Sequence, residues 1–101
     1  MAGGGGPAVN HLHSEFDLEK GDVVVVDLHG QANVVLMDAT NYDDYQGGRS
    51  YRYFGGLAEK SPVRLPAPRS GHWHLVVDLG GYPGTVRAGV RVQKSGQEAT
   101  A

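Results

Sequence analysis

The sequence contains no cysteine among its 101 residues. Disulfide bonds, iron–sulfur clusters and thiolate zinc sites are therefore excluded. A small chain without disulfides is more typical of the cytoplasm than of secreted proteins. Positive charge is also scarce, because nine Lys and Arg against eleven Asp and Glu give a formal net charge of −2. The basic residues form no stripe, so nucleic acid is not an expected partner.

Long apolar runs are absent as well. The longest, Val23–Val26, is far too short to cross a bilayer. The glycine-rich start of the chain lacks the charged and apolar regions of a signal peptide. We therefore expect a cytoplasmic protein without a membrane partner. Residues 1–9 are predicted to be a disordered leader, residues 10–92 a single β-sandwich domain, and residues 93–101 a disordered tail.

Helical periodicity is missing too, whereas apolar and polar residues alternate between turn residues that recur about every 8 to 12 positions. This pattern predicts an all-β protein, a mostly antiparallel, jelly-roll-like β-sandwich of seven to eight strands with no substantial helix. Trp73 and Phe16 are expected near the centre of the core. Pro62 is expected to place its strand at a sheet edge. The predicted strands cover residues 10–18, 23–28, 34–37, 51–54, 61–65, 71–79 and 86–92.

Four of the five histidines form two His-x-His pairs, His11 with His13 and His72 with His74. Residues two apart on a strand point to the same face, so each pair places two imidazoles side by side. Imidazole is a common ligand of transition metals such as Zn²⁺. A metal site needs the two strands to be neighbours. The alternative is that all four are polar residues on outer faces, because Leu12 and Trp73 take the inward direction.

A second candidate site is the segment from Tyr42 to Phe54, which holds five of the eight aromatic residues interleaved with arginines. Exposed tyrosine and arginine are enriched at recognition surfaces. The alternative is a long loop that folds its own tyrosines over the sheet as a lid. The candidate ligand-binding residues are Tyr42, Tyr45, Arg49, Tyr51, Arg52 and Tyr53.

The neighbouring polar residues Asp38, Asn41, Asp43 and Asp44 offer several oxygen atoms that Ca²⁺ could bind. Their spacing does not match a calcium-binding loop, and no glutamate closes it. Side-chain hydrogen bonds to nearby backbone explain these residues more simply.

Several motifs together resemble a small bacterial family known as a domain of unknown function, which occurs alone or fused to a TIR domain. They include Lys20-Gly21-Asp22-Val23, Asn33 to Asp38 and Ser70-Gly71-His72-Trp73-His74. The resemblance covers roughly residues 10–92 and implies a β-sandwich, but it supplies no catalytic residues. A looser likeness is to jelly-roll modules such as the bacterial pre-peptidase C-terminal domain and the GOLD domain, which act in binding, trafficking or folding.

His72 and His74, followed by Asp78, also resemble the first cupin motif, in which a histidine pair and a glutamate bind metal inside a jelly roll. The sequence departs from it by having aspartate in place of glutamate and no second histidine motif after His74. The predicted function is therefore a non-catalytic module that binds a small ligand or a protein, needs no cofactor, and can form a homo-oligomer. The alternative is a cupin-like metalloenzyme that uses the two histidine pairs.

Overall fold

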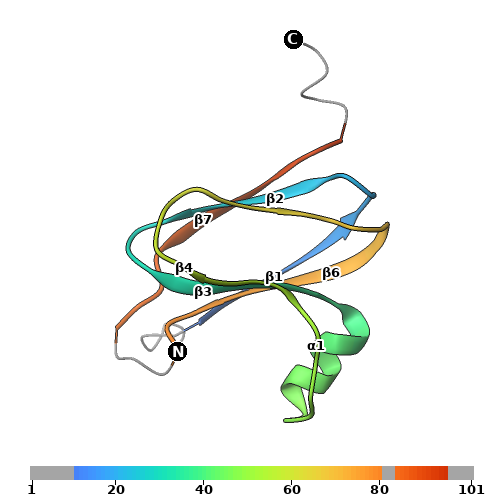
Figure 1. Cartoon of the computed structure of the whole chain (residues 1–101), viewed down its shortest axis with the longest axis horizontal. Coiled ribbons are helices and arrows are strands. Elements are labelled where there is room, and N and C mark those ends of the chain that lie inside the picture. The colour runs from blue at the N-terminus through green and yellow to red at the C-terminus, as the bar shows by residue number, and fades with distance from the viewer. Residues whose placement is uncertain (1–10, 81–83, 96–101) are drawn as a thin grey trace, which may run out of the picture.

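The structure is a computed structural model and describes residues 11–80 and 84–95. Within these ranges the chain forms seven strands and one short helix, arranged as two antiparallel sheets packed face to face (Figure 1). The predicted all-β sandwich is confirmed, and its likeness to a jelly roll stays a prediction. The elements are β1 (His11–Leu18), β2 (Val23–Leu28), β3 (Ala32–Asp38), α1 (Ala39–Gln46), β4 (Phe54–Ala58), β5 (Val63–Pro66), β6 (Gly71–Asp78) and β7 (Ala88–Gln93).

The ends of the chain lie mostly outside the described residues. The predicted leader, residues 1–9, falls there, as do residues 96–101 of the predicted tail. Residues 93–95 are described: β7 reaches Gln93, and the next two residues bind the side chain of Asp22. The folded part therefore continues to Ser95, beyond the predicted boundary at residue 92.

The seven strands form a four-stranded and a three-stranded sheet. One sheet has the order β1-β6-β3-β4 and the other β5-β2-β7, with antiparallel pairing throughout. The strand β2 is central in the smaller sheet, as its continuous apolar run indicates, and Val24, Val25 and Val26 are fully buried. The strand β5 begins directly after Pro62 and lies at a sheet edge, as predicted.

The main core lies between the two sheets. Trp73 is 1% exposed at its centre, as predicted, and Phe16 is half-buried and packs against the same cluster. Alternate residues of β2, β3 and β6 point inward and fill this space, because successive strand residues face opposite sides. The buried residues of this cluster are Leu18, Val24, Val26, Ala32, Val34, Leu36, Leu65, Ala67, Trp73, Leu75 and Val77.

The outer face of the four-stranded sheet carries a second, smaller apolar cluster. It consists of Val35, Met37 and Val76, and Tyr42 and Tyr45 of α1 pack against it. In Figure 1 the helix accordingly lies on the side of this sheet that faces away from β2 and β7. This sheet is therefore covered on both faces where α1 crosses it.

The helix α1 corrects the expectation of an irregular polar loop after β3. Asp38 is its N-cap, and its side chain accepts a hydrogen bond from the backbone N–H of Asn41 at 2.9 Å. Tyr42 and Tyr45, three residues apart, share the side of the helix that packs on the sheet. The capping confirms that backbone hydrogen bonding explains Asp38, and tertiary packing stabilises a helix too short to be stable alone.

The fourth strand begins later than predicted. The expected strand at residues 51–54 is irregular up to Tyr53, and β4 runs from Phe54 to Ala58. Gly55 and Gly56, which were interpreted as the end of a strand, lie inside it. A Cβ atom on Gly55 would lie 2.1 Å from the carbonyl oxygen of Val34, and its φ is +112°. Glycine is therefore what allows β4 to pair with β3.

Asp22 joins the turn after β1 to the end of β7. Its carboxylate is fully buried and accepts hydrogen bonds from the backbone N–H groups of Glu19 at 2.8 Å and Ser95 at 2.7 Å. The ammonium group of Lys94 lies 2.6 Å away and is the largest cause of a pKa of Asp22 well below its ordinary value. These contacts explain the Lys20-Gly21-Asp22-Val23 motif structurally.

In the described part of the chain, no helix has the length and apolar character needed to cross a membrane.

Candidate functional site

The two histidine pairs lie on neighbouring strands. The strands β1 and β6 pair antiparallel, with Glu15 opposite His74, Asp17 opposite His72 and His11 opposite Asp78. The odd-numbered residues of β1 and the even-numbered residues of β6 share the outer face of the four-stranded sheet. The adjacency on which the metal interpretation depends is therefore present.

His13 and His74 contact each other directly. The Nε2 atom of His13 lies 2.8 Å from Nδ1 of His74, so one ring donates a hydrogen bond and the other accepts it. The ring of Tyr42 lies flat over both imidazoles, with centroid distances of 4.4 Å to His13 and 4.0 Å to His74. His74 is only 7% exposed, which corrects the expectation of an exposed histidine, and burial lowers its pKa.

Tyr42 contacts the histidines through its ring more than through its hydroxyl. The hydroxyl oxygen lies 3.4 Å from Nδ1 of His13, while the planes of the two rings differ by only 6°. Parallel stacked rings place the hydroxyl above the imidazole and away from the in-plane lone pair, so this hydrogen bond is weak at best. The α1 tyrosine therefore acts mainly as an aromatic cover.

His72 lies next to this pair and is bound by two carboxylates. Its Nδ1 is 2.7 Å from Asp17 and its Nε2 is 2.8 Å from Glu15. Both ring nitrogens face acceptors, so both carry protons when the contacts form. The hydrogen bond to Asp17 is the largest cause of a raised pKa of His72, and the hydrogen bond to Glu15 is the next. The hydrogen bond between His72 and Glu15 also lowers the pKa of Glu15.

Among the described residues, a set of possible metal ligands comprises His13, Glu15 and His74, whose ligand atoms lie within 4.8 Å of one another. Two imidazoles and one carboxylate suit divalent transition metals such as Zn²⁺. Of the four histidines predicted from the sequence, only His13 and His74 belong to this set. His72 is edge-on to His74 at 5.1 Å between ring centroids, and His11 lies further along β1.

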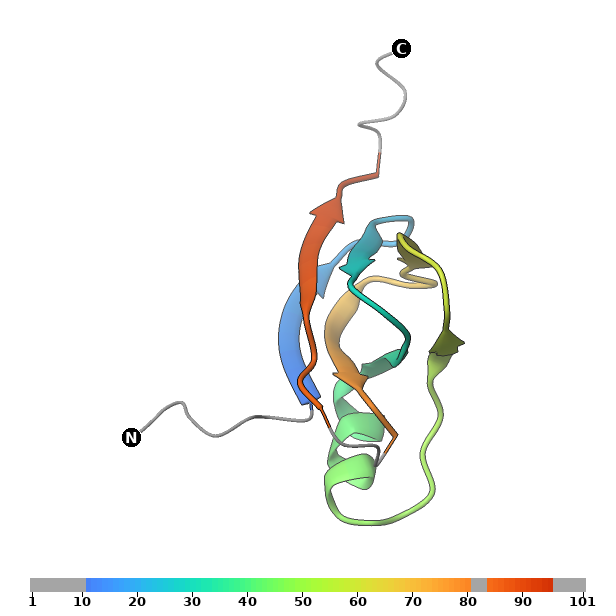
Figure 2. The same cartoon turned by 90° about the vertical axis from the view of Figure 1, so that its left-hand side faces the viewer.

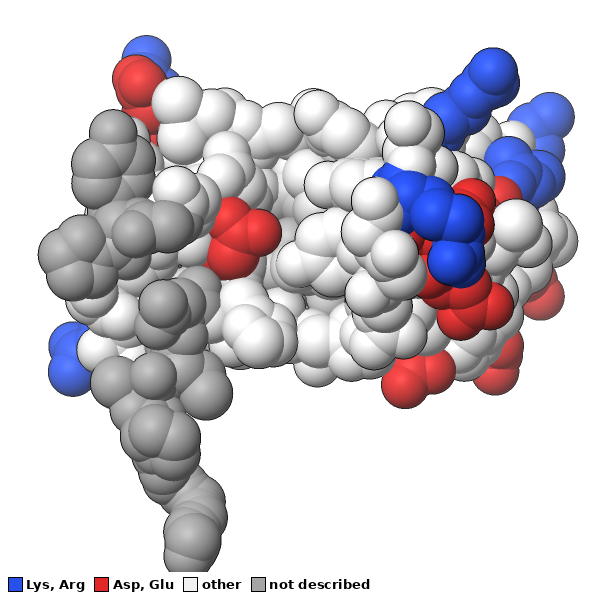
Figure 3. Space-filling view, turned by 90° about the horizontal axis from the view of Figure 1, so that it is seen from below, with Lys and Arg blue, Asp and Glu red and all other residues white. Residues whose placement is uncertain are grey.

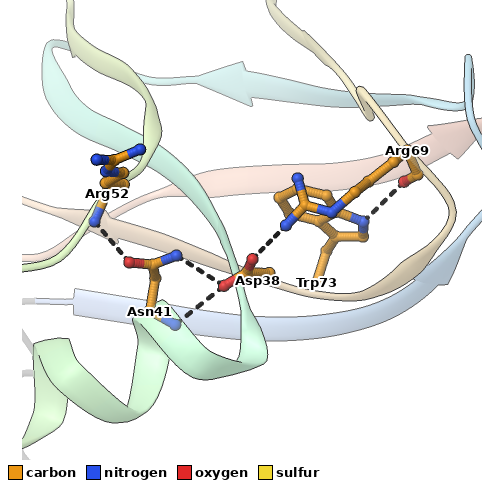
Figure 4. A network of polar contacts seen from close by, with 5 residues as sticks. All are labelled: Asp38, Asn41, Arg52, Arg69 and Trp73. Carbon is orange, nitrogen blue, oxygen red and sulfur yellow. Dashed lines mark hydrogen bonds and ion pairs between the residues drawn. The ribbon is translucent and has the colours of Figure 1, made fainter.

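A small cleft opens where α1 leaves the sheet (Figure 4). Its floor contains Asp38, which accepts hydrogen bonds from the side chain of Asn41 at 2.8 Å and from Arg69. The backbone hydrogen bond from Asn41 is the main reason why the pKa of Asp38 is lowered. The cleft has a volume of about 250 Å³ and is lined by Met37, Asp38, Asn41, Arg52, Phe54, Arg69 and Trp73.

The two arginines of the cleft are held differently. The guanidinium of Arg69 lies 5.0 Å from the ring centroid of Trp73 and also reaches Asp38. The backbone N–H of Arg52 donates to the side-chain oxygen of Asn41 at 2.8 Å, while its guanidinium extends away from Asp38 (Figure 4). Asp38 therefore balances the charge of Arg69, and Arg52 adds a positive charge at the rim.

The residues predicted in the tyrosine segment separate into two groups. Tyr42 and Tyr45 are on α1 and pack on the sheet, and burial raises the pKa of Tyr45. Arg49 binds Asp44 at 2.9 Å beyond the end of the helix. The second group remains open to solvent: Tyr51 and Tyr53 are 36% and 48% exposed, and Arg52 lines the cleft.

Leu57, Arg69 and Trp73 complete this surface and were missed in the sequence, whereas Phe54 ends the predicted segment. Phe54 and Leu57 are 47% and 60% exposed, and together with Tyr51 and Tyr53 they are the exposed large hydrophobic residues of the described chain. All four lie between residues 51 and 57, where the chain leaves α1 and runs along the side of the molecule into β4 (Figure 2). Arg69 and Trp73 join them only through folding, so no local sequence pattern reveals them.

Charge is unevenly distributed on the face that carries α1. Figure 3, which views the molecule from below, shows most charged side chains of both signs toward the right-hand end, with an acidic group nearer the middle and a few charges at the opposite end. Such a surface offers no extended field of one sign, which agrees with the balanced composition of the chain.

These features define a small two-sheet β-sandwich with a short helix over one outer face. A family model described as "Domain of unknown function (DUF1883)" matches residues 9–96, and the chain belongs to this family. The resemblance to a family of unknown function is thus confirmed, while fusion to TIR domains stays a prediction. Comparison with curated proteins and with solved structures found no match.

Proposed function

We propose that this protein is a non-catalytic binding module that recognises a segment of another protein carrying apolar residues next to an acidic residue. Its recognition surface, called here the 51–57 surface, consists of residues 51–57 and the adjoining cleft. The observation that carries the proposal is the gathering of the exposed large hydrophobic residues of the described chain on this one segment. Scattered exposed apolar residues need no explanation. Here all four lie within residues 51–57, and Phe54 of this group lines the cleft.

The composition of the 51–57 surface supports protein recognition. Tyrosine, phenylalanine and arginine are enriched at protein interfaces, because they bring a large contact area with few rotatable bonds or several donors. Phe54 leans edge-on toward Trp73 at 6.0 Å between ring centroids, so the ring is supported from below while nearly half of it faces solvent. A supported, exposed ring loses little conformational freedom on binding.

The backbone of β4 offers a second means of attachment. This strand is the last in the order β1-β6-β3-β4 and is hydrogen-bonded to β3 on one side. Peptides commonly bind by adding a strand to such an edge. The space beside Gly56 is open, since a Cβ atom at this position would meet nothing within 4 Å.

Charge favours an acidic residue in the partner. Asp38 is already bound by Asn41 and Arg69, so its negative charge is compensated within the cleft. Arg52 extends from the rim and can form a charge-assisted pair with a carboxylate of the partner. The Arg69 guanidinium, which is more than half exposed, adds donors nearby.

The remaining parts of the proposal concern setting and alternatives. We place the protein in the cytoplasm, with neither nucleic acid nor membrane as a partner, and we treat a homo-oligomer through β4 as the competing use of the same edge. A cupin-like enzyme receives less support, because a cupin binds its metal between the sheets. The described core there is apolar, and His13, His72 and His74 lie on the outer face.

The test is selection of a displayed library of random peptides on the untagged protein, followed by affinity measurement of the selected peptides. We expect enriched peptides that combine an acidic residue with aromatic or aliphatic residues. Phe54→Ser and Arg52→Ala should each weaken their binding about tenfold or more, as interface anchors do. The matched control is Arg91→Ala, which lies on the smaller sheet and should leave affinity unchanged.

Two outcomes would overturn the proposal. The first is a selection whose peptides bind the Phe54→Ser and Arg52→Ala variants as tightly as the original chain. The second is a stable dimer in sedimentation that dissociates on Leu57→Ser, because the 51–57 surface would then serve self-association.

A further inference from the structure

We infer that His13, Glu15 and His74 form a binding site for one divalent transition-metal ion of the Zn²⁺ type on the outer face of the four-stranded sheet. The site lies on β1 and β6, away from β4 at the other edge of the same sheet. The inference therefore does not depend on the proposed peptide recognition, and each can fail without the other.

The contact between the two imidazoles is the first argument. A hydrogen bond of 2.8 Å between Nε2 of His13 and Nδ1 of His74 places both in-plane lone-pair positions in one small space. Two nitrogens bound to one tetrahedral zinc at about 2.05 Å are about 3.3 Å apart. The two nitrogens must therefore separate by about half an ångström. The rings must also turn within their common plane so that both lone pairs converge on the metal, and the shared proton moves to the other nitrogen of the donating ring.

Strand register supplies the third ligand. Glu15 lies directly opposite His74 in the β1–β6 ladder, and His13 is its neighbour two residues along the same face. The carboxylate now binds His72, but it is half exposed and has three rotatable bonds, so it can turn toward the imidazole pair. His72 retains its contact with Asp17 at 2.7 Å when Glu15 turns away.

Tyr42 holds the two ligand rings in place and covers one side of the pair. It stacks on the faces of His13 and His74, with planes that differ by 6° and 5°. A metal binds an imidazole in the plane of the ring, at its edge. The ring centroids of His13 and His74 are 5.1 Å apart, so Tyr42 lies over the contact between them and shields the metal position on one side. His74 is anchored further by its burial at 7% exposure.

The three ligands leave a fourth tetrahedral position. Sites with three protein ligands keep that position for water or for a donor from another molecule. In this protein Tyr42 covers one side of the two histidine rings, so we expect the fourth donor to approach from the side that the tyrosine leaves uncovered. A bound ion would also join β1, an edge strand, to β6 through side chains in addition to the backbone ladder.

The test uses the untagged full chain, stripped with a chelator, and measures Zn²⁺ binding by competition with a chromogenic chelator. We expect one ion per chain with a dissociation constant of about 1 μM or lower. His13→Gln should weaken binding at least a hundredfold, and Glu15→Gln about tenfold, in line with the loss of single ligands or their neighbours. Cobalt should give the intense visible absorption of a tetrahedral site, which His13→Gln abolishes.

The matched control is His29→Gln, since His29 is exposed in the turn between β2 and β3. It should bind Zn²⁺ like the unchanged chain. Circular dichroism must show that His13→Gln and Glu15→Gln remain folded, and both lie at surface positions that make this the expected result. Less than a tenth of an ion per chain, or equal losses in His13→Gln and His29→Gln, would overturn the inference.

Discussion

Asp22 and His74 are the buried polar or charged side chains among the described residues, and they are hydrogen-bonded in opposite ways. The carboxylate of Asp22 accepts from two backbone N–H groups and from the ammonium group of Lys94. His74 has a single hydrogen bond, to another histidine, and its remaining neighbours are aromatic rings. One group has used its bonding capacity, whereas the other has nitrogen lone pairs and protons that can be rearranged.

This difference separates a structural polar group from a candidate ligand. A buried acceptor with several fixed donors gains nothing from a further partner, and its loss leaves those donors without one. In a pair of neutral imidazoles the shared proton can move to the other nitrogen of the donating ring, which leaves two lone pairs for a metal. Burial alone therefore does not identify a functional site. The number of hydrogen-bonding positions that already have a partner is more informative.

The largest expected effect is on stability at Asp22. Asp22→Asn places an NH₂ group against Lys94 and the N–H of Glu19, so donors face donors. We expect the midpoint of thermal unfolding to fall by about 10 °C or more. Asp27→Asn is the control, because Asp27 is more than half exposed and 4.0 Å from Arg91. Similar midpoints for both variants would contradict the structural role of Asp22.

The second effect is the pH dependence of stability. The pKa of Asp22 is lowered in the folded chain, from an ordinary value of 3.8. Its contribution is therefore complete above that ordinary value and is lost as pH falls toward the folded pKa. We expect the free energy of unfolding, measured by urea titration, to fall between pH 6 and pH 2.5. The fall should be larger in the unchanged chain than in Asp22→Asn. A stability gap that widens on acidification would contradict this sign.

A smaller effect is expected where Tyr42 covers the histidines. Tyr42→Ala removes two stacking contacts and should lower the free energy of unfolding by about 1 to 2 kcal/mol. Tyr42→Phe should change it by less than about 0.5 kcal/mol, because the hydroxyl is poorly placed for a hydrogen bond with His13. Chemical denaturation of both variants measures the two values. Equal losses would show that the hydroxyl, and not the ring, stabilises this end of α1.

The smallest effect is expected on the 51–57 surface. Tyr53→Ser and Leu57→Ser should each leave the free energy of unfolding within about 0.5 kcal/mol of the original chain, since both side chains are exposed. Denaturant titration provides the measurement. A loss of 2 kcal/mol or more at either position would mean that these residues serve folding, and the argument for recognition would lose its basis.

Much of the fold could be predicted from local patterns. Alternation placed Trp73 in the core and the histidines of β6 on the outer face, and Pro62 indicated an edge strand. The pairing of β1 with β6 could not be predicted, because it joins residues more than fifty positions apart. The burial of His74 depends on the same long-range arrangement and on a helix that covers it.

The helix and the fourth strand show why the remaining elements were missed. The segment after Asp38 has no strong apolar periodicity, so its sequence resembles a polar loop. Its two inward tyrosines indicate a helix only once the apolar outer face of the sheet is known. An Asp38 cap followed by tyrosines three residues apart was the available signal. Gly55 was interpreted as the end of a strand, because nothing in the sequence shows that a carbonyl of β3 passes where its side chain would be.

The account is tested most directly by long-range proton–nitrogen NMR spectra of the five histidine rings before and after one equivalent of Zn²⁺. We predict that Nε2 of His13 and Nδ1 of His74 shift strongly and together, while the signals of His11 and His29 stay in place. Unchanged signals of His13 and His74, or shifts spread evenly over all five rings, would contradict the claim that this pair is available to a metal.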